Sequence, residues 1–143
     1  VYLMADIDWL GAGAEIKRLL EPLKPGLRDV FLGTEMADVK NLGQITPAVH
    51  ILFQGDRVGD GSQSGLAAKV SQSWLVVLAY RATPGQPTAG FLLHKIMSAI
   101  SGKPYENSTF TRVTPGVRPS YSGGVAYLPL AFEVQLKFKG ERS

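Results

Sequence analysis

The sequence predicts a single α+β domain, with one mostly antiparallel or mixed sheet, a helical layer on one of its faces and a long extended hairpin. Three observations support this fold class. Residues 69–81 and 126–139 show the period-two alternation of strands, residues 87–101 show the apolar stripe of an amphipathic helix, and a polar glycine-rich segment joins two of the strands. At 143 residues the chain is long enough for one core, and we treat 1–143 as one domain.

The stretch 69–81 is predicted to be the central strand. It is rich in β-branched and aromatic residues and contains no Gly or Pro. From Trp74 onward both of its sides are apolar, which is typical of a strand covered on both faces. We expect the side with Trp74 to pack beneath the helices. The other side carries Leu75, Val77 and Ala79, and what covers it is left open at this stage.

The remaining elements follow from periodicity and from turn residues. We expect two amphipathic helices, the first with an apolar stripe of Ala14, Ile16, Leu19, Leu20 and Leu23, the second with Leu92, Leu93, Ile96, Met97 and Ile100. In chain order the predicted elements are a helix over 6–20, an edge strand over 28–32, a brief helix over 35–42, a strand over 47–54, the helix over 87–101, a weak strand over 105–113, a turn-rich connection over 114–124 and a final strand over 126–139.

Two local features carry their own expectations. The segment 55–65 is polar and glycine-rich, so we predict a long hairpin tip there, and loops of such length are often functional. Pro129 interrupts the final strand. Because proline cannot donate to a ladder, we expect it at an edge or a bulge.

Composition narrows the range of functions. The chain has no cysteine, which excludes disulfides, thiol catalysis and thiolate zinc sites. The net charge is +3 and the pI about 9.3, but basic and acidic residues are interspersed, so a specific nucleic-acid partner is not favoured. No apolar run approaches the roughly 20 residues that span a bilayer, and we expect no membrane partner.

No catalytic or metal-binding constellation is visible. His50 and His94 are the only histidines, and no Gly-x-Ser-x-Gly elbow accompanies them. Asp56 and Asp60 lack the regular oxygen ligands of a calcium loop, and the glycines near them do not form a phosphate loop. Glu133 is expected to pair with Lys137 on a polar strand face. We therefore predict no enzyme activity, no cofactor, no metal and no small-molecule substrate.

The sequence instead favours a contact surface. If the final strand lies in the same sheet as 69–81, its second face adds to one mixed apolar and polar surface. That surface comprises Leu75, Val77, Ala79, Tyr127, Ala131 and Glu133. Such a face is typical of a protein–protein contact. The alternative is that a helix of the same chain covers it, and the sequence does not decide between the two.

Three stretches resemble small tail proteins of Mu-like contractile-tailed phages and prophages, of the tail-terminator type. They are Pro47-Ala-Val-His-Ile-Leu-Phe-Gln-Gly-Asp-Arg-Val58, Gln72-Ser-Trp-Leu-Val-Val-Leu-Ala79 and Tyr121-Ser-Gly-Gly-Val-Ala-Tyr-Leu-Pro-Leu-Ala-Phe-Glu133, and the helix segment Leu92-Leu-His-Lys-Ile-Met97 is also similar. The resemblance spans roughly residues 45–138, and the combination is more specific than any one piece.

The resemblance implies a structural role. Proteins of this type form a ring, commonly six-fold, at the head-proximal end of a tail, where the ring stops polymerisation of the tube and sheath and docks the head. The implied partners are other copies of the chain, the tail tube and sheath proteins, and the head–tail connector. The implied location is the bacterial host cytoplasm during assembly and then the virion tail. The resulting candidate assembly surface comprises Asp56, Arg57, Val58, Leu75, Val77, Ala79, Tyr121, Tyr127 and Glu133.

Two alternatives remain at this point. A nucleic-acid-binding α+β domain is suggested by the basic pI and by aromatic residues on strands, namely Trp74, Tyr80 and Tyr127. A small hydrolase would have to use His50 or His94.

Overall fold

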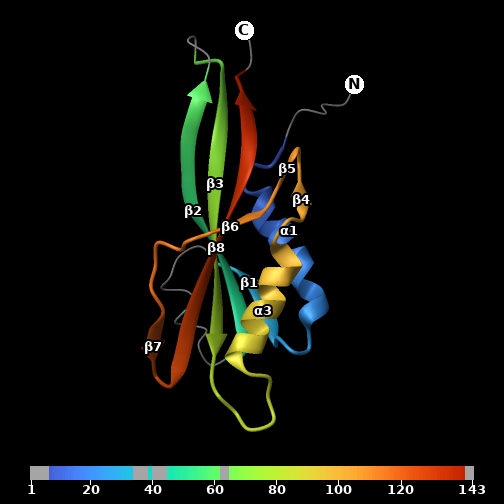
Figure 1. Cartoon of the computed structure of the whole chain (residues 1–143), viewed down its shortest axis with the longest axis vertical. Coiled ribbons are helices and arrows are strands. Elements are labelled where there is room, and N and C mark those ends of the chain that lie inside the picture. Colours follow the sequence, from blue (N-terminus) through green and yellow to red (C-terminus); the bar gives the residue numbers. More distant parts are fainter. Residues whose placement is uncertain (1–6, 34–38, 40–44, 62–64, 141–143) are drawn as a thin grey trace.

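A computed structural model describes residues 7–33, 39, 45–61 and 65–140 of the chain. In these residues a six-stranded mixed sheet has two helices on one face, which confirms the α+β prediction (Figure 1). The helical elements are α1 (Gly11–Leu20), a 3₁₀ turn (Glu21–Leu23) and α3 (Ala89–Ile100). The sheet strands are β1 (Asp29–Leu32), β2 (Ala48–Gly61), β3 (Ala67–Tyr80), β6 (Thr111–Val113), β7 (Ser120–Ser122) and β8 (Val125–Lys139). A separate small hairpin consists of β4 (Pro104–Tyr105) and β5 (Ser108–Thr109).

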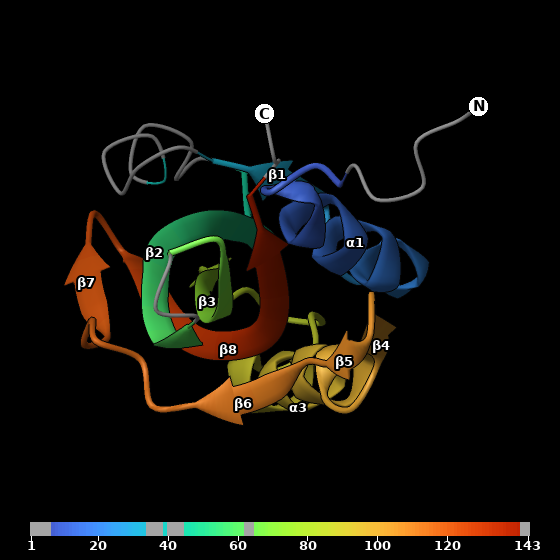
Figure 2. The same cartoon turned by 90° about the horizontal axis from the view of Figure 1, so that it is seen from above.

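The strand β3 is central, as predicted. The strand order is β1-β2-β3-β8-β6, with β7 also paired to β8, and only the β1–β2 pairing is parallel. Trp74 lies opposite Phe53 on one side and Phe132 on the other. These rings form the centre of a core that β3 shares with both helices. Seen from above, β2, β3 and β8 coil tightly, with the helices on one side and β7 on the opposite side (Figure 2).

The helix α1 begins at Gly11, later than the predicted start, because Asp8 forms a turn before it. The Asp8 carboxylate accepts the Leu10 amide at 3.0 Å, and the Asp8 carbonyl accepts the Gly11 amide. Ala14, predicted to be in the apolar stripe, is exposed. Gly13 takes the inward position instead, because a Cβ built there would lie 2.6 Å from the Trp74 ring, a distance that only glycine avoids.

The helix α3 agrees closely with its prediction. Leu92, Ile96 and Ile100 are buried, and Leu93 and Met97 pack against the same core. The hydroxyl oxygen of Thr88 accepts the Phe91 amide at 3.2 Å, a typical N-cap that satisfies one free donor of the first turn.

The second face of β3 is covered from within the chain. Leu75, Val77 and Ala79 are at most 1% exposed and belong to a second apolar cluster. We call it the inner cluster, and its other members are Val39, Leu52, Val125, Tyr127 and Ala131. Val113 and Val117 pack against this cluster. The segment between β6 and β8 therefore provides part of the cover that the sequence left undecided between a helix and another protein.

β2 and β3 form the predicted long antiparallel hairpin, but its tip does not extend over 55–65 as predicted. β2 continues through this segment to Gly61 and stays paired with β3, with irregularities between Phe53 and Gly55 and between Val58 and Gly61. Gly55 has a φ of 111°, a conformation suited to a bulge at a glycine. The bulges break the period-two pattern, so a continuous strand has the sequence appearance of a loop.

Other predictions are confirmed or refined. The 28–32 strand is β1 at the edge of the sheet. The weak strand over 105–113 is divided among β4, β5 and β6, and the 114–124 connection contains β7. Pro129 falls between the part of β8 that pairs with β7 and the part that pairs with β6, as expected of an edge position. The helix predicted over 35–42 lies outside the described residues except at Val39, which is helical and buried.

Candidate assembly surfaces

Three strands form a projection beyond the helices, at the upper end of the molecule in Figure 1. We call this projection the arm and define it as residues 55–61 of β2, 67–73 of β3 and 133–139 of β8. Asp56, Arg57 and Val58 lie on it and are exposed, with Val58 at 64%. These candidate residues are therefore accessible to another protein.

A chain of hydrogen bonds fixes the arm to the start of α1. Asp56 accepts the indole N–H of Trp9 at 3.1 Å, and the Trp9 carbonyl accepts the Gln72 amide nitrogen at 2.6 Å. The Gln72 side-chain oxygen accepts the indole N–H of Trp74 at 2.8 Å. Gln72 is fully buried, and these bonds offset the loss of its hydration. Sequence periodicity gave no indication of these contacts of Trp9, because its partners Asp56 and Gln72 are far away in the chain.

Glu133 is half-buried at the base of the arm. Its carboxylate accepts the Ser73 hydroxyl at 3.5 Å and lies 4.0 Å from an Arg57 guanidinium nitrogen. This ion pair crosses from β8 to β2 over β3, and it replaces the predicted pairing of Glu133 with Lys137. These two contacts link β8 to β3 and β2 at the base of the arm.

The strand β7 carries the second exposed candidate. Tyr121 is 75% exposed, near the end of the molecule opposite the arm tip (Figure 1). The turn that follows requires Gly123 and Gly124, whose φ angles are 60° and 81°. The Gly123 carbonyl accepts an Arg81 N–H at 3.0 Å, and a Cβ at Gly124 would lie 2.6 Å from the same guanidinium. Tyr127, by contrast, is 3% exposed and belongs to the inner cluster.

Four of the nine candidate residues cannot form an outer surface in this structure. Leu75, Val77, Ala79 and Tyr127 are buried within the chain, in a cluster against which Val113 and Val117 pack. The expectation of an exposed apolar face is thus corrected for these four. The exposed candidates separate into two groups, Asp56 to Val58 on the arm and Tyr121 on β7.

The two histidines do not form a common site. His50 faces the inner cluster side of the sheet, opposite Val77, whereas His94 is exposed on α3 on the helical side. His50 is 1% exposed, stacks on Phe31 at 5.1 Å between ring centroids, and its Nε2 has no partner among the described residues. Burial lowers its pKa from 6.5 to about 4. It is a neutral core residue.

The other proposed chemistries gain no support. No group of three or more potential metal-ligating side chains occurs in the described part of the chain. Trp74 and Tyr127, two aromatics of the nucleic-acid alternative, are buried, and the Tyr80 hydroxyl donates to the Pro87 carbonyl. Within the described ranges, no helix is long and apolar enough to cross a membrane.

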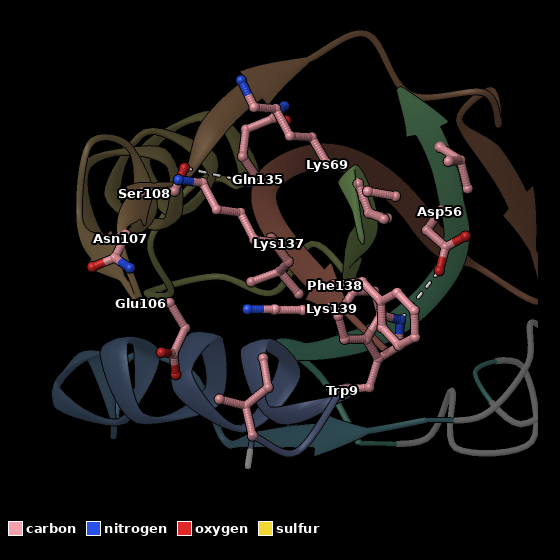
Figure 3. Close-up of a pocket in the computed structure, with 15 residues that line it drawn as sticks. Trp9, Asp56, Lys69, Glu106, Asn107, Ser108, Gln135, Lys137, Phe138 and Lys139 are labelled. Atoms are coloured by element: carbon pink, nitrogen blue, oxygen red, sulfur yellow. Dashed lines mark hydrogen bonds between the residues drawn. The ribbon is translucent and has the colours of Figure 1, made fainter. Parts of the chain in front are cut away.

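A groove of about 1180 Å³ opens between the arm and the region containing Trp9 and the β4–β5 turn (Figure 3). Trp9 and Phe138 meet edge to face there, with ring centroids 6.4 Å apart, and lysines from β3 and β8 line the groove.

The family model for phage tail terminator proteins matches residues 6–142, nearly the whole chain. The chain belongs to the phage tail terminator family. The match confirms the resemblance seen over 45–138 and extends it through α1. The protein is therefore a structural component of a phage tail that works with other tail or head components. No curated protein sequence matches this chain.

Proposed function

We propose that this tail terminator assembles into a hexameric ring that caps the tail tube, stops its growth together with that of the sheath, and docks the head through the connector. The family supplies the tail role, and the arrangement of exposed candidates supports the ring. In a ring each subunit contacts the next head to tail, so two different surfaces of one subunit must meet.

The observation that carries the proposal is the separation of two exposed surfaces. Val58 and its neighbours lie on the arm, and Tyr121 lies on β7, toward opposite ends of the long axis (Figure 1). An exposed tyrosine is a frequent anchor of protein interfaces, because it buries a large rigid area and keeps a hydroxyl for hydrogen bonding. A self-complementary dimer would need one patch only. Two distant patches suit a head-to-tail contact.

The test is the oligomeric state, alone and with purified tail tubes, by native mass spectrometry and negative-stain microscopy. We expect closed rings, free or at tube ends, and tubes that no longer elongate once capped. As a control, Phe91→Asp changes an exposed apolar residue on α3, outside both surfaces, and should leave ring formation intact. A protein that remains monomeric and does not associate with tubes would contradict the proposal.

In the bacterial cytoplasm, where we propose that assembly occurs, the ring would form on a growing tube before head attachment. No described feature favours a second function, since the two histidines are separated and Trp74 and Tyr127 are buried.

A further inference from the structure

The groove beside the arm is bordered by the edge of β8. Five consecutive residues of that strand, Gln135 to Lys139, line it. Successive side chains of a strand point to opposite faces. Ala68, Lys69 and Val70 of β3 line the groove as well, but β3 is paired with β2 and β8 on its two sides. Beyond Glu133, by contrast, β8 has no described strand on the side away from β3, so its edge can face the groove. The groove is thus an opening along a sheet edge.

The main chain of β8 is open at this edge. β6 pairs with β8 at Glu133, and the next outward amide, that of Gln135, donates to the Ser108 hydroxyl at 3.3 Å. At the opposite edge of β8, which faces β3, the Gly140 amide donates to the Leu66 carbonyl just before β3. In an antiparallel ladder these directions alternate along the strand. The N–H and C=O groups of Lys137 and Lys139 therefore point outward, and no described strand pairs with them.

The side chains beside this edge have an excess of positive charge on one face. Lys137 lies directly opposite Lys69, and Lys139 follows on the same face of β8. Like charges opposite each other in a sheet are unfavourable. The groove has two carboxylates, Asp56 and Glu106, and Asp56 already accepts the Trp9 indole. Among the described residues no ion pair joins either carboxylate to these lysines.

The other face of the same edge is apolar and partly exposed. Phe138 is 49% exposed, Val58 64% and Ile7 37%, and all three line the groove with Trp9. Exposed apolar side chains that gather around an open strand edge are characteristic of a binding site rather than of solvated surface. The edge therefore offers hydrogen bonds, an apolar face and a basic face to one extended ligand.

We propose that an extended segment of a partner protein of the tail or head, with alternating apolar and acidic residues, binds as an added strand at the β8 edge. Residues opposite each other on adjacent strands share a face. A ligand residue opposite Lys137 therefore lies beside the lysines and should be acidic. Its neighbours lie beside Leu136 and Phe138 and should be apolar. This binding mode takes affinity from the main chain and specificity from alternate side chains.

A different protein fits this edge better than a second copy does. The outer edge of β2 on the arm would be the natural strand to donate, but its faces are mismatched. With Asp56 and Val58 on the apolar side, Arg57 would lie on the lysine side and add a further positive charge. A nucleic acid would satisfy the lysines but would leave the apolar face and the outward main-chain groups without complementary partners.

The experiment measures binding of three short synthetic peptides to the full chain by isothermal titration calorimetry. The first alternates Val and Glu. The second has the same composition in two blocks, and the third is the alternating peptide with N-methyl groups on the amides that would pair with β8. We expect saturable binding of the first, and at least tenfold weaker binding of the other two, because one loses the facial pattern and the other the edge hydrogen bonds.

Chain variants locate the site. Lys137→Glu should weaken binding of the alternating peptide at least tenfold, whereas Lys95→Glu makes the same charge change on α3 and should leave it unchanged. Circular dichroism checks that both variants fold. Equal loss in both variants, equal binding of all three peptides, tighter binding of a short DNA duplex, or no binding up to about 1 mM peptide would each overturn the inference. Ring formation by wild type, measured separately, shows whether the proposed function survives that outcome.

Discussion

At the scale of the residue, the positions that sequence patterns miss are those whose role depends on distant partners. Gln72 lies on the apolar side of the central strand as an isolated polar residue, and only the fold shows that Trp9 and Trp74 satisfy its amide. Gly13 looks like a poor helix residue, yet the nearby Trp74 ring excludes any side chain there. The contacts of Gln72 with Trp9 and of Gly13 with Trp74 join residues about sixty positions apart, which no local periodicity can report.

His50 makes folding stability depend on pH. Its pKa is about 4 in the folded chain and near 6.5 when unfolded, because burial disfavours the charged form. Below pH 6.5 the folded state therefore binds fewer protons than the unfolded state. The part of the unfolding free energy that depends on neutral His50 is fully present above pH 6.5 and is lost as the pH falls toward 4. The loss amounts to about 3 kcal/mol of unfolding free energy.

Denaturant unfolding of wild type and His50→Leu at several pH values between 4 and 7 checks this prediction. The leucine variant should lose most of the pH dependence in that window, while His94→Gln, on the exposed face of α3, should retain the wild-type dependence. Parallel curves for wild type and His50→Leu would show that His50 is not the titrating group.

At the scale of the element, strand and helix predictions succeed where an element is regular and packs on one face. The helix α3 and the strand β8 are close to their predicted ranges because their apolar periods are uninterrupted. β2 was predicted too short because its bulges interrupt the alternation and its distal half is polar. The open side of β3 was undecidable, since an apolar strand face has the same sequence whether its own chain or a neighbour covers it.

The same substitution at two valines on neighbouring strands distinguishes a position packed inside the fold from an exposed one. Val77→Asp places a carboxylate in the inner cluster, where the side chain is 1% exposed, and should destabilise the fold by about 4 kcal/mol or more. Val58→Asp makes the same change on the arm at 64% exposure and should leave the unfolding free energy within about 0.5 kcal/mol of wild type.

Thermal or urea unfolding followed by circular dichroism distinguishes the two variants. A folded Val77→Asp protein with wild-type stability would mean that the inner cluster is not closed in solution. It would also restore Leu75, Val77 and Ala79 as an assembly surface.

At the scale of the whole molecule, the fold keeps its apolar core in one half and extends three strands from it. Both faces of the sheet are covered around Trp74 and Leu75, whereas the arm is exposed on one face and fixed to the body by the Trp9 contacts. The sequence identified Asp56 to Val58 and Tyr121 as surface candidates by family resemblance. It could not show that they lie far apart, because that depends on the register of β7 and β2 relative to β3 and β8.

This separation predicts how damaged subunits combine. Val58→Asp should disable the arm contact, and Tyr121→Asp should disable the β7 contact, with both proteins folded. Neither variant alone should form rings. In a 1:1 mixture, each Val58→Asp subunit retains an intact β7 surface that fits the intact arm of a Tyr121→Asp subunit. The two surfaces that remain free on that pair are the Val58→Asp arm and the Tyr121→Asp β7 surface. Because both are disabled, association should stop at a heterodimer.

Native mass spectrometry of the two variants, separately and mixed, gives the readout. A heterodimer present only in the mixture supports head-to-tail contact between arm and β7. Rings in the mixture would show that one intact contact suffices. If instead both variants form wild-type rings alone, neither Val58 nor Tyr121 lies in the subunit contact. A heterodimer that also fails to cap tail tubes would show that closure of the ring, rather than each contact by itself, creates the surface that ends the tail.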